Sequence, residues 1–179
     1  MTTVKTVSMA LIGALTLVAA PTAAAGSAPT NLPKVKISHD PSLCVGGAKQ
    51  PAALVRVSGL KDRKGQVRIQ LYPDRPDEFL ESGKWITRLD APVTPSGYMD
   101  LCVKLPYAGE MAMVVMHDRE GDGKLNPLKD GAGLPGNPKM KLAKPDYEMA
   151  SFVAKPGVTP MSVRLNYRRG LLGFGPVSN

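Results

Sequence analysis

Segments in which apolar and polar residues alternate constrain this chain more than any other feature of its sequence. In residues 66–72 the apolar side chains Val67, Ile69 and Leu71 are separated by polar ones. Successive side chains of a β-strand point to opposite faces, so this period of two is typical of a half-buried strand. We therefore expect the three apolar side chains to face a core. Similar segments occupy residues 53–58, 99–105 and 161–167.

The arrangement of these segments predicts the fold class. Residues 110–117 are apolar on both faces, as in a central strand covered on both sides. Most of the 17 prolines and 18 glycines fall between the segments, and no stretch of a dozen residues shows a helical stripe. The polar loop at 61–65 predicts a hairpin between 53–58 and 66–72. We expect an all-β fold, an antiparallel β-sandwich of about seven strands.

The first 25 residues have the layout of a secretory signal peptide. Lys5 precedes an apolar run at about 7–20, and Ala23 and Ala25 are the small residues expected before a cleavage point. The run is shorter than the roughly 20 residues that a membrane-spanning helix needs. We therefore expect a periplasmic or secreted product with no membrane span after the signal is removed.

The remainder of the chain divides into three predicted parts. Residues 26–52 are predicted to be a flexible leader and an N-terminal covering segment. Residues 53–168 are predicted to form the β-sandwich domain. Residues 169–179 contain glycine at 170, 173 and 175 and are predicted to be an irregular C-terminal tail.

Cys44 and Cys102 are predicted to form a disulfide, because exported compartments oxidise thiols. The alternatives are two free thiols or a metal pair, for which only His39 and His117 could supply nitrogen ligands. Closing this loop contributes about 4 kcal/mol in the chain-entropy model, as an upper estimate. Cys102 alternates with the apolar residues of its segment, so the disulfide is expected to hold the N-terminal segment across the outside of that strand.

The formal net charge of +8 limits the classes of partner. Basic residues are spread along the chain, and aromatic residues make up only 5% of it, without the aromatic–basic interleaving that stacks bases. We expect no nucleic-acid binding. The charge favours solubility and a weak affinity for anionic polymers of the cell envelope.

One motif has a spacing that suits a hard cation. Counting Asp118 as position 1, glycine stands at position 6, where a calcium loop bends sharply. Position 12 is Lys129, where an EF-hand loop needs a bidentate glutamate. The alternative is a polar turn in which Asp118 and Asn126 bond to backbone amides. Calcium is thus the one cofactor considered, and its predicted ligands are Asp118, Glu120, Asp122, the Lys124 carbonyl and Asn126.

No arrangement of residues predicts catalysis. His117 and Asp118 are neighbours in a predicted strand and therefore point to opposite faces. Ser38, His39 and Asp40 are adjacent in sequence, whereas a triad requires convergence in space. A Gly-x-Ser-x-Gly elbow, a phosphate-binding loop and an HExxH helix are absent from the sequence. We predict no catalytic residues and expect that the protein is not an enzyme.

Several stretches together resemble a known family. They read VRVSGL, GQVRIQLY, LCVKLPYAGEMAMVVMHDREGDGKLN, DGAGLPGNP and SVRLNY, and they run from about Ala53 to Tyr167. They are similar to the domain-of-unknown-function 2141 family, a group of small exported bacterial domains. The resemblance implies a periplasmic or secreted sandwich of immunoglobulin- or transthyretin-like type and no established activity.

Three functional hypotheses follow from the sequence. The first is an exported, non-enzymatic module that binds a ligand or an envelope or extracellular partner, with the loops at 117–138 as its functional end. The second is a calcium-stabilised structural domain. The third is a hydrolase on a transthyretin-like frame, because residues 167–170 (YRRG) resemble the C-terminal YRGS of the hydroxyisourate hydrolases. Those enzymes also need paired histidines, and this chain has two histidines in distant segments.

Overall fold

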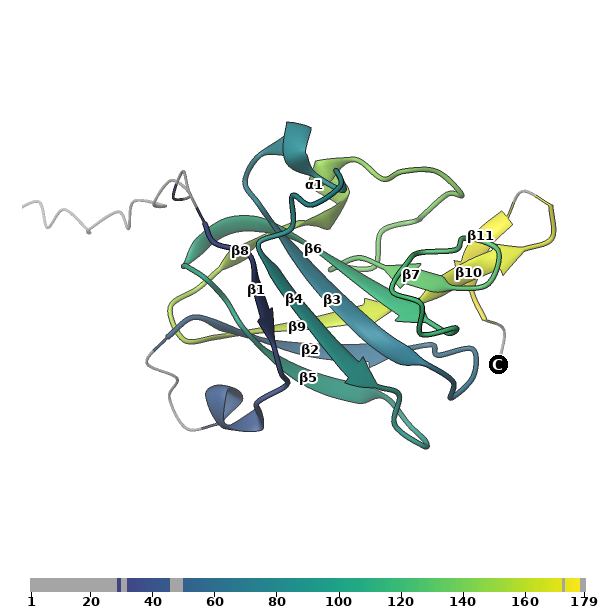
Figure 1. Ribbon diagram of the computed structural model, residues 1–179, viewed down its shortest axis with the longest axis horizontal. Helices are drawn as coiled ribbons and strands as arrows, with labels where there is room; N and C mark the ends of the chain where they lie inside the picture. The colour runs from purple at the N-terminus through teal and green to yellow at the C-terminus, as the bar shows by residue number, and fades with distance from the viewer. Residues whose placement is uncertain (1–28, 30–31, 46–49, 172, 178–179) are drawn as a thin grey trace, which may run out of the picture.

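The computed structural model describes residues 29, 32–45, 50–171 and 173–177 (Figure 1). The predicted signal peptide, residues 1–25, lies outside the described residues. In the described part the chain forms eleven strands and very little helix. In chain order the elements are β1 (Val35–Ile37), η1 (Pro41–Cys44), β2 (Ala52–Ser58), β3 (Gln66–Pro73), η2 (Pro76–Glu78), β4 (Thr87–Pro92), β5 (Met99–Lys104), β6 (Gly109–Asp118), β7 (Gly131–Gly133), α1 (Tyr147–Ala150), β8 (Ser151–Ala154), β9 (Val158–Arg164), β10 (Asn166–Arg169) and β11 (Gly173–Pro176).

The strands form two sheets, so the predicted β-sandwich is confirmed. The large sheet has the order β1-β4-β3-β6-β7-β10-β11, with β8 also paired to β6, and the small sheet has the order β5-β2-β9. Most pairs are antiparallel as predicted, but β1–β4 and β2–β9 are parallel, so both sheets are mixed. The strand number exceeds the predicted seven because β1, β7, β8, β10 and β11 have only three or four residues each, too few to show alternation.

The inner core lies between the two sheets and contains the predicted apolar side chains. Val55 and Val57 of β2 are fully buried, as are Val67 and Leu71 of β3, and Ile69 is 1% exposed. However, β2 and β3 do not form the predicted hairpin, because β2 pairs with β5 and β9 whereas β3 pairs with β4 and β6. The connection at 59–65 crosses from one sheet to the other, so the valines of the two strands belong to one inner core but come from different sheets.

A second apolar layer covers the outer face of the large sheet. Tyr72 on β3 makes an edge-to-face contact with Phe79 at 5.3 Å between ring centroids, and Phe79 contacts Tyr147 in the same manner at 5.9 Å. Val114 and Met116 of β6 are buried beneath this layer. Strand β6 is therefore covered on both sides, as its sequence predicts.

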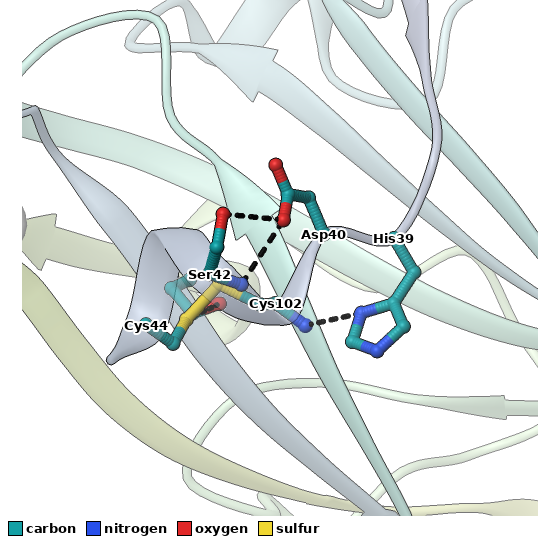
Figure 2. The surroundings of a disulfide bond; sticks show 6 residues. His39, Asp40, Ser42, Cys44 and Cys102 are labelled. Atoms are coloured by element: carbon teal, nitrogen blue, oxygen red, sulfur yellow. Dashed lines mark hydrogen bonds between the residues drawn. A yellow bond between two sulfur atoms is a disulfide. The ribbon is translucent and has the colours of Figure 1, made fainter.

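The N-terminal segment crosses the outside of the small sheet, where the predicted disulfide joins Cys44 to Cys102 of β5 (Figure 2). Asp40 caps the short helix η1 by accepting hydrogen bonds from the backbone N–H and the hydroxyl of Ser42 at 3.0 and 2.6 Å. The backbone N–H of Cys102 donates to His39 Nδ1 at 2.9 Å. These contacts attach residues 39–44 to the outer face of β5, as the alternation around Cys102 predicts.

The prediction of an irregular C-terminal tail was wrong for residues 173–176, which form β11 and pair antiparallel with β10 (Figure 1). The glycine spacing that suggested irregularity has a different cause. A Cβ atom on Gly173 would lie 2.5 Å from the carbonyl oxygen of Arg169, so glycine permits the close approach of the two strands. Among the described residues, no helix is long and apolar enough to span a membrane.

Candidate ligand-binding site

The side chains of the 118–126 motif, which suggested calcium, form hydrogen bonds within the turn. The carboxylate of Asp118 accepts from the backbone N–H groups of Gly121, Asp122 and Gly123 at 2.8, 3.2 and 2.9 Å. It also accepts from the side-chain amide of Gln66 at 3.0 Å. Burial would raise the pKa of Asp118, but these hydrogen bonds outweigh burial and lower it. Both oxygens of the first predicted ligand are therefore engaged within the protein.

The other three predicted side-chain ligands of calcium, Glu120, Asp122 and Asn126, are also bonded to partners in the chain. Asp122 accepts from the backbone N–H of Lys124 at 2.8 Å, and the side-chain oxygen of Asn126 accepts from that of Leu128 at 3.1 Å. Glu120 forms an ion pair with Lys129 at 2.6 Å. The polar-turn alternative is thus confirmed for Asp118 and Asn126. In the described part of the chain, no three acidic, histidine or cysteine side chains are grouped as metal ligands. Calcium binding stays a prediction and would require these bonds to be replaced.

His117 is an internal support of the fold. Its side chain is fully buried, with Nδ1 at 2.7 Å from the Tyr167 hydroxyl and Nε2 at 2.8 Å from the Lys64 carbonyl oxygen. That hydroxyl accepts from the backbone N–H of Lys61 at 3.0 Å, so its own proton can be donated to Nδ1. The ring is then neutral, with its proton on Nε2, and burial lowers its pKa. Because His39 lies against β5, the structure does not pair the two histidines as the hydrolase hypothesis requires.

A cavity of about 760 Å³ opens on the outer face of the large sheet. Its floor consists of outward-facing side chains of β3, β4, β6 and β7, and its walls come from residues 80–85, 123–130 and 140–145, with Phe174 of β11. This size is within the range of small-molecule sites. Apolar residues predominate in the lining, and the floor includes Tyr72, Val114, Met116 and Ala132.

Three polar side chains lie together on this floor. Arg68 is 5% exposed and is held by Asp90, at 2.5 Å from Nε, and by the Gly123 carbonyl oxygen, at 2.5 Å from Nη1. Gln70 of β3 is directly opposite Arg88 of β4 in the strand register. Neither side chain forms a hydrogen bond or ion pair with any of the described residues, and Arg88 Nε is buried without a partner.

The guanidinium of Arg88 packs against an aromatic ring, but it forms no ion pair with the described residues. It lies over the ring of Trp85, with its central carbon 4.5 Å from the ring centroid. Burial lowers its pKa, and the positive charge of Arg68 lowers it further. The carboxylate of Asp90 attracts Arg88 electrostatically, but it is bonded to Arg68. The floor therefore has two guanidinium groups, of which Arg68 is bonded to a carboxylate and Arg88 is not.

A protein-family model described as an uncharacterized protein conserved in bacteria (DUF2141) matches residues 55–162. This match spans more than half of the chain. The chain belongs to the DUF2141 family. No curated protein and no solved structure matches it significantly.

The matched DUF2141 region contains the strands that build the cavity floor. It runs from within β2 into β9 and includes β3, β4, β6 and β7. The cavity wall at 123–130 lies inside the loops that the sequence indicated as the functional end of the domain. Phe174 is the lining residue contributed from beyond the matched region, by strand β11.

Sequence reasoning missed the cavity of this DUF2141 domain because it placed Arg68 and Gln70 on a solvent-facing side of β3. The structure buries both, at 5% and 7% exposure, beneath the outer layer. One signal was available. Leu125 and Leu128 stand in an otherwise polar loop, and they are 44% and 62% exposed at the cavity wall. Exposed leucines beside a concave surface are typical of a binding site.

Proposed function

We propose that this protein is an exported, non-enzymatic module that binds a small, largely apolar ligand in the cavity on the outer face of the large sheet. The observation that carries the proposal is the cavity itself, about 760 Å³ in volume, with apolar walls and a few converging polar groups on its floor. Binding sites for small molecules combine these two properties, because apolar burial supplies affinity and polar groups fix orientation.

The surroundings of the cavity support binding without chemistry. Its lining includes neither histidine nor cysteine among the described residues. Ser82 lies at the rim, and no general base is bonded to it in the described part of the chain. Nucleophilic catalysis by serine requires such a base.

Export is supported by the N-terminal sequence and by the disulfide. The first 25 residues have the signal-peptide layout, and disulfides persist mainly in oxidising compartments. The bacterial family is consistent with a periplasmic or secreted location. In that location the ligand would come from the cell envelope or from the medium.

A neutral dye whose emission increases in apolar surroundings, Nile red, tests the proposed site. We expect saturable binding of one dye per chain. Ala143→Trp and Ser82→Trp, which place a bulky ring in the cavity wall, should each weaken binding by roughly tenfold or more. Ser96→Trp, in an exposed turn outside the cavity, is the matched control and should bind as the wild type does. Absence of saturable binding, or equal binding by all variants, would overturn the proposal.

A further inference from the structure

We infer that the ligand of this cavity is an anionic amphiphile, whose oxyanionic head group is held by Arg88 and Gln70 and whose apolar body extends along the walls to the rim. This inference rests on the proposed function and specifies its ligand class. Carboxylate and phosphate head groups share the chemistry that these two side chains recognise.

Arg88 supplies the first argument. The Trp85 ring covers one face of its guanidinium, whereas the N–H groups at the edge have no acceptor among the described residues. A buried charged donor without an acceptor is costly. The fork of N–H groups matches the two oxygens of a carboxylate or phosphate, which would supply the missing acceptors.

Gln70 supplies a second donor at the same place. It is opposite Arg88 in the register of β3 and β4, and side chains in such a pair have Cβ atoms about 5 Å apart. Gln70 is 7% exposed and lines the cavity, but its amide bonds to no described residue. An oxygen atom between the two side chains can therefore accept from the amide and from the guanidinium together.

The charges around the floor favour an anion over a neutral head group. Asp90 is bound to Arg68, and the lining carboxylate Asp130 accepts from the backbone N–H groups of Arg119 and Asn126 at 3.0 and 2.8 Å. Neither carboxylate is bonded to Arg88. A ligand oxyanion would neutralise this remaining positive charge in a partly dehydrated site, where electrostatic attraction is stronger than in water.

The remainder of the cavity favours an apolar body. Met116, Val114 and Leu134 lie beside the polar group of the floor, and Leu125 and Leu128 continue the apolar surface to the rim. Each methylene group buried here should tighten binding by roughly fourfold. A head group at Arg88 leaves the walls free for a chain or ring system, so a short anion such as acetate should bind far more weakly than a long one.

The test compares 12-carbon amphiphiles that differ only in their head groups, at concentrations below micelle formation. Trp85 is the single tryptophan of the chain and contacts Arg88, so its emission reports on binding. We expect dodecanoate and dodecyl phosphate to bind at least tenfold more tightly than dodecanol, and dodecyltrimethylammonium to bind most weakly. Isothermal calorimetry provides the same comparison without relying on the fluorophore.

Two variants and a control connect this preference to the floor. Arg88→Met should reduce the preference for dodecanoate over dodecanol to about twofold or less, because the anion loses a charged partner. Gln70→Leu should also reduce this preference, because the anion loses a neutral hydrogen-bond donor. Arg56→Met is the matched control. Arg56 also stacks on an aromatic ring, that of Tyr98, but it belongs to the small sheet and is paired with Asp100 outside the cavity.

The outcomes distinguish this inference from the proposed function. If dodecanol binds as tightly as dodecanoate and both displace Nile red, the anionic preference is wrong and the cavity remains a binding site. Tightest binding of dodecyltrimethylammonium would likewise overturn the inference. If neither dye nor any amphiphile binds, both proposals fail. A preference for dodecyl phosphate over dodecanoate supports the inference and identifies phosphate as the better head group.

Discussion

At the scale of single residues, the Tyr167 hydroxyl joins two parts of the chain that are far apart in sequence. It connects His117 of β6 to the backbone N–H of Lys61, in the loop that crosses between the sheets. Tyr167→Phe leaves a buried imidazole nitrogen and an amide without partners. We expect the free energy of unfolding to fall by about 1–3 kcal/mol, measured by urea denaturation. Tyr98→Phe, at a ring that is 56% exposed, should be nearly neutral. Equal effects of the two substitutions would contradict this role.

His117 also gives stability a defined pH dependence. Burial lowers its pKa below the ordinary 6.5, so the unfolded chain binds a proton at this residue before the folded chain does. The stability associated with a neutral His117 is thus complete above about pH 6.5 and decreases as the pH falls below that value. Urea titrations between about pH 5 and 7 should show this slope in the wild type and a smaller one in His117→Gln. Parallel slopes would show that His117 does not titrate differently on folding.

At the scale of elements, the turn at 118–126 is predicted to be stable without a metal. Its carboxylates already accept backbone amides, and Lys124 and Lys129 place positive charge beside them. Thermal unfolding in excess calcium should therefore have the same midpoint as unfolding in the presence of a chelator. Calcium at about 100 times its dissociation constant would add about 2.7 kcal/mol if it bound the folded state alone, so a midpoint that rises with calcium concentration would support the metal hypothesis. Asp118→Asn should destabilise the protein equally in both conditions.

Much of the fold could be predicted at this scale, because alternation reports which side chains share a face. It identified the core positions of β3 and β5 and the double burial of β6. It could not identify strand partners. Val55 and Val67 belong to segments on either side of the same polar loop at 61–65, and this pattern fits a hairpin or a crossing between sheets. The structure has the crossing, since β2 instead pairs in parallel with β9 about 100 residues later.

The candidate site was less predictable, for a related physical reason. Alternation separates Arg68 and Gln70 from the core face, but it does not reveal whether other segments cover the second face. That depends on the segments at 79–85 and 134–150, which pack apolar side chains on the sheet through mostly irregular backbone and the short helix α1. The polar turn was foreseen because its residues are neighbours in sequence. The cavity floor is assembled from four separate strands, so the sequence did not predict it.

At the scale of the whole molecule, the proposed export predicts the chemical identity of the mature chain. Expressed from residue 1 in a Gram-negative host, the protein should be recovered from the periplasmic fraction without residues 1–25, as measured by intact mass. The same mass should be two hydrogens lower than that of the reduced chain, because Cys44 and Cys102 are joined. Ala25→Asp, which removes the small residue before the predicted cleavage point, should leave a larger precursor. Recovery of an unprocessed wild-type chain from the cytoplasm would contradict export.

The disulfide and the proposed binding cavity lie on opposite sides of the molecule. The disulfide lies on the outer face of the small sheet, whereas the cavity lies on the outer face of the large sheet, with the inner core between them. Replacing both cysteines, as Cys44→Ala and Cys102→Ala together, should lower the free energy of unfolding by up to about 4 kcal/mol, because the unfolded chain regains the freedom of a 58-residue separation. The affinity for Nile red should be unchanged at a temperature where this variant remains folded.

Arg88→Met should have the opposite pair of effects. It should lose the preference for anionic amphiphiles, whereas its free energy of unfolding should stay close to that of the wild type. A cysteine variant that stays folded but loses the dye would show that the two faces are coupled through the core, and the division of roles between the sheets would then be wrong.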